Sequence, residues 1–227
     1  IKSRPLLPLA ARKPQTEPPQ AGIKRLTVKA PAQLPYLAMG YHAPVLRDVS
    51  ADWEPYALEV LVGVLDGNES ARLNKELVRE QRIASSAGAG YDSTARGPGM
   101  FYLDGTPSEG KTVAELETAL RGEIDRLIRD GVTAEELLRV KAQTVASRVF
   151  QRDSVFYQAM QIGQLESIGL SYRDLDTMLK KLQAVTAEQV REVAKKYLID
   201  DSLTVAVLDP QPLDQKAPRA PVKGGRH

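Results

Sequence analysis

The sequence has 227 residues, 42% hydrophobic and 26% charged, which is enough to bury the core of one large domain or two small ones. Its 31 basic and 29 acidic residues are interspersed and give a net charge of +2, so bulk charge favours neither nucleic acid nor an anionic membrane as a partner. The absence of cysteine excludes disulfides, thiolate metal sites and cysteine nucleophiles, and the two histidines are His42 and His227. Because catalytic zinc generally takes several protein ligands, usually with more than one histidine, we expect no metal site in this chain.

Proline content divides the chain into three parts. Residues 1–22 are rich in proline and have too few paired apolar positions to offset the entropy of ordering, which predicts an extended inter-domain linker. The tail at 210–227 has the same character and is expected to be flexible. Residues 23–209, which lie between them, are predicted to form one domain.

Two strands are predicted at the start of this domain. Leu26 and Val28 alternate with polar residues, which indicates a half-buried strand. Residues 35–41 indicate a second, more buried strand, with His42 as a partly buried residue at its end.

Two helices and two more strands are predicted next. A helix over 52–65 ends in turn residues, and a charged amphipathic helix follows over 70–81. Strands are expected over 83–91 and 100–106, joined by a loop at 92–99 whose glycines and proline break regular structure.

Four further helix starts are indicated by a hydroxyl residue that precedes an acid or amide by three positions. Such a hydroxyl can accept a hydrogen bond from an orphan amide of the first turn. The pairs are Thr112 with Glu115, Thr133 with Glu136, Ser171 with Asp174, and Thr186 with Gln189.

Apolar residues at helical spacing predict that two of these helices pack a stripe on a sheet. The stripes are Leu116, Leu120, Ile124 and Leu127 in one helix, and Leu138, Ala142, Val145 and Val149 in the other. A last alternating strand contains Leu203, Val205 and Val207. Strand pairs mixed with helices predict an α+β fold, an antiparallel-rich mixed sheet of about five to six strands covered by helices on one face.

The helix over 70–81 has four cations at offsets of three, seven and ten, which places them on one helical face near two acids. The cations are Arg72, Lys75, Arg79 and Arg82, and the acids are Glu76 and Glu80. One interpretation is a solvated face of salt bridges. The other is a cavity wall that binds peptide carboxylates, for which the forked donors of arginine are suited.

The stretch ALEVLVGVLDGNESARLNKELVREQRIASSAGAGYD, residues 57–92, resembles the C-terminal, metal-free half of bacterial zinc metallopeptidases of the pitrilysin and insulinase type. The corresponding pieces are Asp66-Gly67 at a helix end, SARL at 70–73, the leucine-arginine-glutamate helix at 76–80 and the small-residue strand at 83–89. The similarity continues through TAEEL, QAVTAEQVREVAKKYL and SLTVAVLDP, so it spans nearly the whole predicted domain.

The resemblance implies a clamshell of two related α/β halves. In this family the N-terminal half has an H-x-x-E-H zinc motif, which is absent here, and the C-terminal half closes over the substrate. We therefore expect the non-catalytic C-terminal domain of a zinc-dependent endopeptidase, which contacts peptide while zinc and catalysis lie on an N-terminal half in the same chain or a neighbouring subunit. This chain alone is expected to be inactive and without a cofactor.

One departure concerns an arginine and a tyrosine that help to hold substrate in many relatives. Their positions fall on Val78 and Ser85 in this sequence. Arg79 and Arg82 are the nearest candidates to replace the arginine, and Tyr91 is the candidate to replace the tyrosine. The other interpretation of Tyr91 is a strand-end tyrosine that packs on the sheet. The candidate substrate contacts are Arg72, Arg79, Arg82, Ser85 and Tyr91.

The small residues at 84–90 predict that another layer approaches this strand closely. That layer is either a helix of the same domain or the contents of the chamber.

Other functions stay open at this stage. A scaffold or assembly subunit of the same fold, without peptidase activity, is the alternative that the changes at Val78 and Ser85 suggest. A domain that binds a small ligand or nucleic acid rests only on the basic helix face, and we predict no nucleic-acid partner. The family suggests the periplasm or cell envelope, with the cytoplasm and a homodimer left open.

Overall fold

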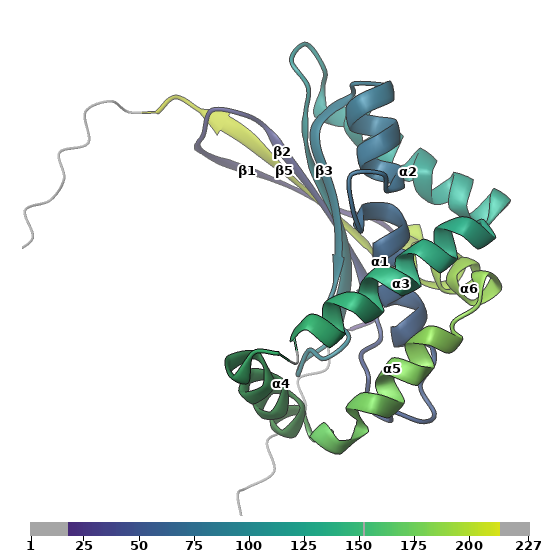
Figure 1. The fold of residues 1–227 in the computed structure, drawn as a ribbon. Coiled ribbons are helices and arrows are strands. Elements are labelled where there is room, and N and C mark those ends of the chain that lie inside the picture. The colour runs from purple at the N-terminus through teal and green to yellow at the C-terminus, as the bar shows by residue number, and fades with distance from the viewer. Residues whose placement is uncertain (1–17, 152, 214–227) are drawn as a thin grey trace, which may run out of the picture.

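The computed structural model describes residues 18–151 and 153–213, and Figure 1 shows their arrangement. The strands are β1 (Lys24–Pro31), β2 (Tyr36–Ala43), β3 (Ala84–Tyr91), β4 (Gly99–Pro107) and β5 (Leu203–Gln211). The helices are α1 (Glu54–Asp66), η1 (Leu73–Glu80), α2 (Val113–Asp130), α3 (Ala134–Gln151), α4 (Val155–Ile168), η2 (Tyr172–Asp174), α5 (Leu175–Ala184), α6 (Ala187–Tyr197) and η3 (Asp200–Ser202). The predicted linker at 1–22 and tail at 210–227 lie mostly outside the described residues. None of the helices in the described ranges is long and apolar enough to span a membrane.

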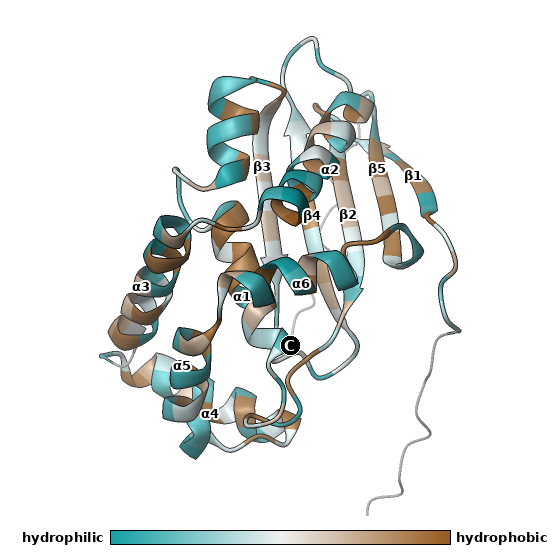
Figure 2. Cartoon of the chain, turned by 90° about the vertical axis from the view of Figure 1, so that its right-hand side faces the viewer, coloured by the Kyte–Doolittle hydropathy of each residue, from teal (hydrophilic) through white to brown (hydrophobic). Residues whose placement is uncertain are grey.

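The described strands form one five-stranded sheet in the order β1-β5-β2-β4-β3. β1 pairs with β5 in parallel, and the remaining neighbours pair antiparallel. All the helices that contact the sheet lie on one side of it, and the other side is concave and open (Figures 1 and 2). The predicted α+β fold, with an antiparallel-rich mixed sheet covered on one face, is therefore confirmed.

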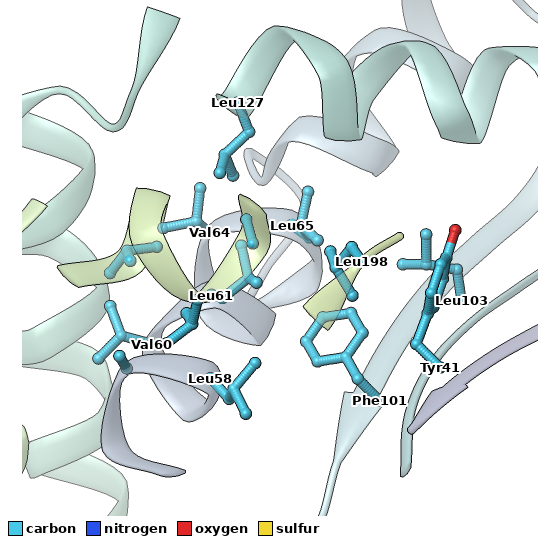
Figure 3. Close-up of a cluster of buried hydrophobic side chains, with 14 of the residues drawn as sticks. Tyr41, Leu58, Val60, Leu61, Val64, Leu65, Phe101, Leu103, Leu127 and Leu198 are labelled. Atoms are coloured by element: carbon cyan, nitrogen blue, oxygen red, sulfur yellow. The ribbon is translucent and has the colours of Figure 1, made fainter. Parts of the chain in front are cut away.

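The core lies between the sheet and three helices, α1, α2 and α6, while α3 and α5 pack on the outer side of α1. Phe101 and Leu103 of β4 point toward the leucines of α1, as Figure 3 shows. The predicted stripe of α2 is confirmed, because Leu116, Leu120, Ile124 and Leu127 are all buried. Their burial removes apolar surface from water, which supplies the main favourable term in folding.

The first strand is confirmed, but its burial was predicted wrongly. Leu26 and Val28 are 45% and 47% exposed, because they lie on the open side of the sheet. Arg25, which precedes Leu26, faces the helices, where it forms a bidentate ion pair with Glu117 of α2 at 2.8 and 2.6 Å. His42 is likewise exposed rather than partly buried.

Three of the four predicted helix caps are confirmed as reciprocal pairs. The backbone amides of Glu115, Glu136 and Gln189 donate to the threonine hydroxyls, and each acid or amide side chain accepts from the amide of its threonine. Ser171 differs, because its hydroxyl accepts from the Arg173 amide and caps the short helix η2.

The helix α4 is absent from the sequence prediction. Ser154 accepts from the Tyr157 amide at its start, and Gly169 ends it in the left-handed conformation with φ of 87°. The residue three positions after Ser154 is a tyrosine, so the capping pattern used for the other helices does not detect this one.

The helix predicted over 70–81 is present but wider than an α-helix. Over η1 the amides bond to carbonyls five residues back, as in Gln81 N–H to Glu76 O at 2.9 Å. Leu73 and Leu77 point into the core. Arg72, Lys75 and Arg79 line one charged cavity, as the sequence pattern predicted, whereas Arg82 lies beyond the end of the helix. Arg82 follows the helix with φ of 53°, the left-handed region, where the chain turns into β3.

The predicted apolar stripe of α3 does not pack on the sheet. Leu138 is 72% exposed and Val149 46% exposed. The inward residue is Val140, whose methyl group lies where a side chain at Gly63 of α1 would be, only 2.4 Å from an ideal Cβ there. The neighbour of α3 is thus a helix with a small contact residue, and the apolar stripe faces outward.

Candidate functional site

The uncovered side of the sheet, here called the open face, has no helix packed on it (Figure 1). The strand register places alternate residues of every strand on it. Five of its large apolar side chains are substantially exposed: Leu26, Val28, Tyr36, Met100 and Tyr102. Aromatic and apolar side chains in one exposed area are typical of a surface that binds another molecule.

Two glycines on the open face leave room for large side chains of β4 to lie over the neighbouring strands. The Met100 thioether lies 2.5 Å from the position of a Cβ at Gly40, and the Tyr102 ring lies 2.1 Å from that of a Cβ at Gly90. Two side chains of β4 therefore lie flat across the neighbouring strands. A residue larger than glycine at either position would have to displace them.

A polar pair interrupts this apolar surface. The Tyr36 hydroxyl donates to Asp104 Oδ2 at 2.5 Å. Burial, and then this hydrogen bond, raise the pKa of Tyr36 to about 12. Gly88 lies beside the pair, with Asp104 Oδ1 3.1 Å from the position of its missing Cβ. This pair thus adds a carboxylate and a phenol to the open face for polar contacts.

The small residues of β3 allow close packing on both sides of the sheet. Ala87 and Ala89 pack against the core, next to α1, while Gly88 and Gly90 lie on the open face. Close helix packing, one of the two predicted explanations, is therefore present. Asp66 at the end of α1 accepts a hydrogen bond from the Ala89 amide at 3.1 Å, and burial raises the pKa of Asp66.

Arg72, a predicted substrate contact, is held in a structural contact. Its guanidinium donates to both carboxylate oxygens of Glu136 at 2.8 and 2.9 Å and to the Gly131 carbonyl at 2.8 Å. The Arg72 hydrogen bonds hold the pKa of Glu136 down at about 2. This pair joins η1 to the start of α3 on the helix side of the molecule.

Arg79 borders the same region, a cavity of about 530 Å³ that is lined by charged residues, Arg72 among them. Around it Glu76 forms ion pairs with Lys75 at 3.3 Å and with Arg126 at 3.3 Å. The interpretation of this helix as a salt-bridged face is therefore the better one for these residues. Arg82 is exposed near the start of β3.

The remaining candidates are far from one another. Ser85 is exposed at an irregularity of β3 and donates to the Thr106 carbonyl at 3.2 Å, whereas Val78 packs against the core. Tyr91 is at the other end of β3, where its ring stacks with Phe101 at 6.4 Å and its hydroxyl donates to the Pro44 carbonyl. Burial raises the pKa of Tyr91, as expected for a packed phenol. The structure does not gather the five predicted contacts into one site.

Tyr91 also borders a cavity of about 510 Å³ between α1, α3 and α4. Its polar part is centred on Glu59, which accepts from the Ser93 hydroxyl and forms an ion pair with Arg148 at 2.5 Å. Both carboxylate oxygens of Glu59 are therefore engaged by the chain itself.

Within the described residues, no group of three or more histidine, cysteine, aspartate or glutamate residues is placed to hold a metal ion. His42 is exposed on the open face, and His227 lies outside the described residues. These donors do not fit a zinc ion, so no chemical step is assigned to zinc on this chain.

Residues 2–144 match the family model described as the peptidase M16 inactive domain. The chain belongs to the M16 peptidase family. A curated M16 relative, the uncharacterized zinc protease YmxG of Bacillus subtilis, is 26% identical over 86% of this chain and 46% of its own length. The chain spans less than half the length of the curated relatives that it matches.

Solved structures share the fold. A protease from Helicobacter pylori has a TM-score of 0.81 at 21% identity, over 90% of this chain and 49% of that chain. The periplasmic protease PqqL from Escherichia coli has a TM-score of 0.64 at 22% identity, over 90% of this chain and 22% of that chain. The resemblance noted in the sequence is therefore confirmed: this M16 chain matches the inactive domain of the family, and its curated relatives are named as zinc proteases.

Sequence reasoning missed the open face. Residues 100–103 read MFYL, apolar at every position, so alternation could not separate the buried Phe101 and Leu103 from the exposed Met100 and Tyr102. The signal that could have found it is the pairing of these large residues with strand glycines at 40 and 90.

Proposed function

We propose that this M16 domain forms the non-catalytic wall of a peptide chamber, with the open face directed toward substrate and toward a zinc-bearing N-terminal half. The observation that supports the proposal is a concave sheet face without helices, with Met100, Tyr102 and Tyr36 exposed on it, in an inactive domain. Apolar and aromatic contacts suit unfolded peptide, since they bind side chains without requiring one sequence.

The domain contributes binding and exclusion of water, while bond cleavage belongs to the partner half. Among the sequence candidates, Arg82 and Ser85 are exposed near the start of β3 and are proposed as contacts at the rim of the open face, whereas Arg79 is proposed as a contact only at the charged cavity on the helix side. Their cations would meet acidic side chains of a peptide. Arg72 and Tyr91 are engaged within the domain and are not needed for this role.

The first experiment measures peptide binding by the 227-residue chain. Fluorescence anisotropy with a labelled unstructured peptide is expected to show binding that weakens at least about thirtyfold in Met100→Ser/Tyr102→Ser, since two large side chains at roughly 1–2 kcal/mol each contribute at least about 2 kcal/mol. Leu138→Ser is the matched control, because Leu138 is 72% exposed but lies on α3. Equal weakening by the control variant, or none by the double variant, contradicts the role of the open face.

A second experiment concerns cleavage. The chain alone is expected to leave peptide intact with or without chelator, and cleavage is expected only after addition of a polypeptide with the H-x-x-E-H motif. Stoichiometric zinc on the isolated chain, or cleavage by it, would refute the proposal. The envelope or periplasm is the proposed location, supported by the fold shared with a periplasmic protease.

A scaffold or assembly subunit without peptidase activity is the second candidate. The packing of Val78 against the core favours it, because a position that supplies a polar substrate contact in relatives is apolar here. An intact zinc motif in the preceding half, together with cleavage, decides against the scaffold.

A further inference from the structure

The helix α4 is exposed in a way that the fold does not explain. Of its residues, Leu165 alone is buried within the described chain. Val155, Phe156 and Met160 are 82%, 68% and 50% exposed. The segment from Val155 to Leu165 has no charged residue, and Glu166 is the single charge of the helix. A helix that is apolar and uncharged on its outer side is normally covered by another surface.

The exposed residues form a stripe. Phe156, Ala159, Met160 and Gly163 are spaced by three, four and seven positions, which places them on one helical side. Leu165 is nine positions from Phe156 and therefore lies on the opposite side, toward the domain. Figure 1 shows α4 at the lower end of the molecule, away from the layered core.

Glycine inside this stripe has no role in the packing of its own chain. A Cβ added at Gly163 would meet no atom within 4 Å, so the domain does not require glycine there. Glycine in a helix interior is unfavourable because of its backbone entropy. A second helix that approaches closely would explain it.

We propose that α4 pairs antiparallel with α4 of a second copy of this chain, around a two-fold axis between Ala159 and Met160. This register places Phe156 of one copy over Gly163 of the other, and Met160 of one copy over Ala159 of the other. The stripe is thus self-complementary, with each large residue opposite a small one, as a symmetric interface requires. The proposal does not depend on the proposed function.

The lack of charge on the α4 stripe and the area that it can bury support a second copy of this chain as the partner that covers it. Two uncharged stripes bring no like charges together, whereas a strongly charged partner would find no charge to pair with. The end of α3 can add area, since a turn closed by Asp153 N–H to Phe150 O at 3.2 Å connects it to α4 and Phe150 is 72% exposed. Aromatic side chains bury about 150–250 Å² each, so two phenylalanines per copy with Val155 and Met160 supply area on the order of the ~1,200 Å² of a stable interface.

The first test is sedimentation equilibrium of the 227-residue chain. A concentration-dependent dimer is expected, with at least a tenfold higher dissociation constant in Phe156→Lys and in Met160→Lys. Leu138→Lys is the matched control, an equally exposed apolar position at the start of α3, and is expected to leave the dimer unchanged. A monomer at every concentration, or a dimer that Phe156→Lys and Met160→Lys leave intact, overturns the proposal.

Gly163→Leu separates pairing from folding. Because its side chain has open space in the single chain, the variant is expected to raise the urea midpoint while it weakens the dimer at least tenfold. An unchanged dimer in this variant contradicts the register.

The second test uses the absence of native cysteine. Ala159→Cys lies beside the proposed axis and is expected to form a covalent dimer under mild oxidation. Gly122→Cys is the control on α2, a helical position with equally open space. Cross-linking of the two variants at the same rate overturns the proposal, as does a failure of Ala159→Cys to cross-link.

Discussion

The ion pair between Arg72 and Glu136 gives a prediction whose size follows from its geometry. The two side chains are 13% and 19% exposed and make bidentate contact. A carboxyl pKa lowered from 4.5 to about 2 corresponds to about 3 kcal/mol at about 1.4 kcal/mol per pKa unit. The Thr133 amide also bonds to Glu136 and remains when the arginine is removed. We therefore expect Arg72→Met to lower the free energy of unfolding by about 2 kcal/mol.

The pH dependence has a definite sign. Because the pKa of Glu136 is lower in the folded chain, its contribution is complete above the unfolded value of 4.5 and is lost as the pH falls from there toward 2. The difference between wild type and Arg72→Met should thus be constant from neutral pH to about 5 and should shrink toward pH 3.

Urea unfolding at several pH values measures this difference, and at neutral pH the melting temperature should fall by about 4–8 °C. Arg129→Met is the matched control, because Arg129 and Asp130 form a pair whose side chains are 69% and 53% exposed. An exposed pair of this kind contributes little. The reasoning is refuted if Arg72→Met costs no more than Arg129→Met, or if its cost does not diminish in acid.

Three further predictions concern the core and the open face. Leu116→Ala should lower the free energy of unfolding by about 2–5 kcal/mol, whereas Leu138→Ala should change it by less than about 0.5 kcal/mol, and equal effects in denaturant titrations would contradict the outward orientation of the α3 stripe. Gly90→Ala should cost about 1–3 kcal/mol by displacing the Tyr102 ring and should cost much less in a Tyr102→Ala background, so an equal cost in both backgrounds counts against the close contact. Asp104→Asn should lower the pKa of Tyr36 from about 12, measured by tyrosine absorbance with Tyr36→Phe as the reference, and an unshifted titration would exclude the carboxylate as a cause. In wild type the raised pKa of this phenol should reduce stability as the pH rises from about 10 toward 12.

Sequence periodicity predicted elements well where the neighbouring layer is a sheet. The α2 stripe is buried because a sheet offers a continuous apolar surface to any residue of the stripe. The same pattern failed for α3, since its neighbour is α1, where the contact positions are Gly63 and Glu59 and the matching residues are Val140 and Arg148. Which side of a helix is buried depends on the partner element, which periodicity does not contain.

The candidate site was less predictable than the fold. Arg72 was selected by residue type and spacing, but its partner, Glu136, is 64 residues away in the sequence. The open face depends on which strands are neighbours. Gly40 and Gly90 make room for Met100 and Tyr102 only because β4 lies between β2 and β3. The Arg79, Arg82 and Ser85 assignments remain proposals.

The position of β5 has a consequence for synthesis on the ribosome. This strand is the last element of the described chain, yet it lies between β1 and β2 and bonds to both, while Gln20 and Gly22 bond to residues 203 and 201 at its start. Until residues 203–211 have left the exit tunnel, β1 has no neighbour and the sheet cannot close. Folding should therefore finish only after the last strand emerges, and a nascent chain stalled before residue 203 should expose two unpaired edges to chaperones.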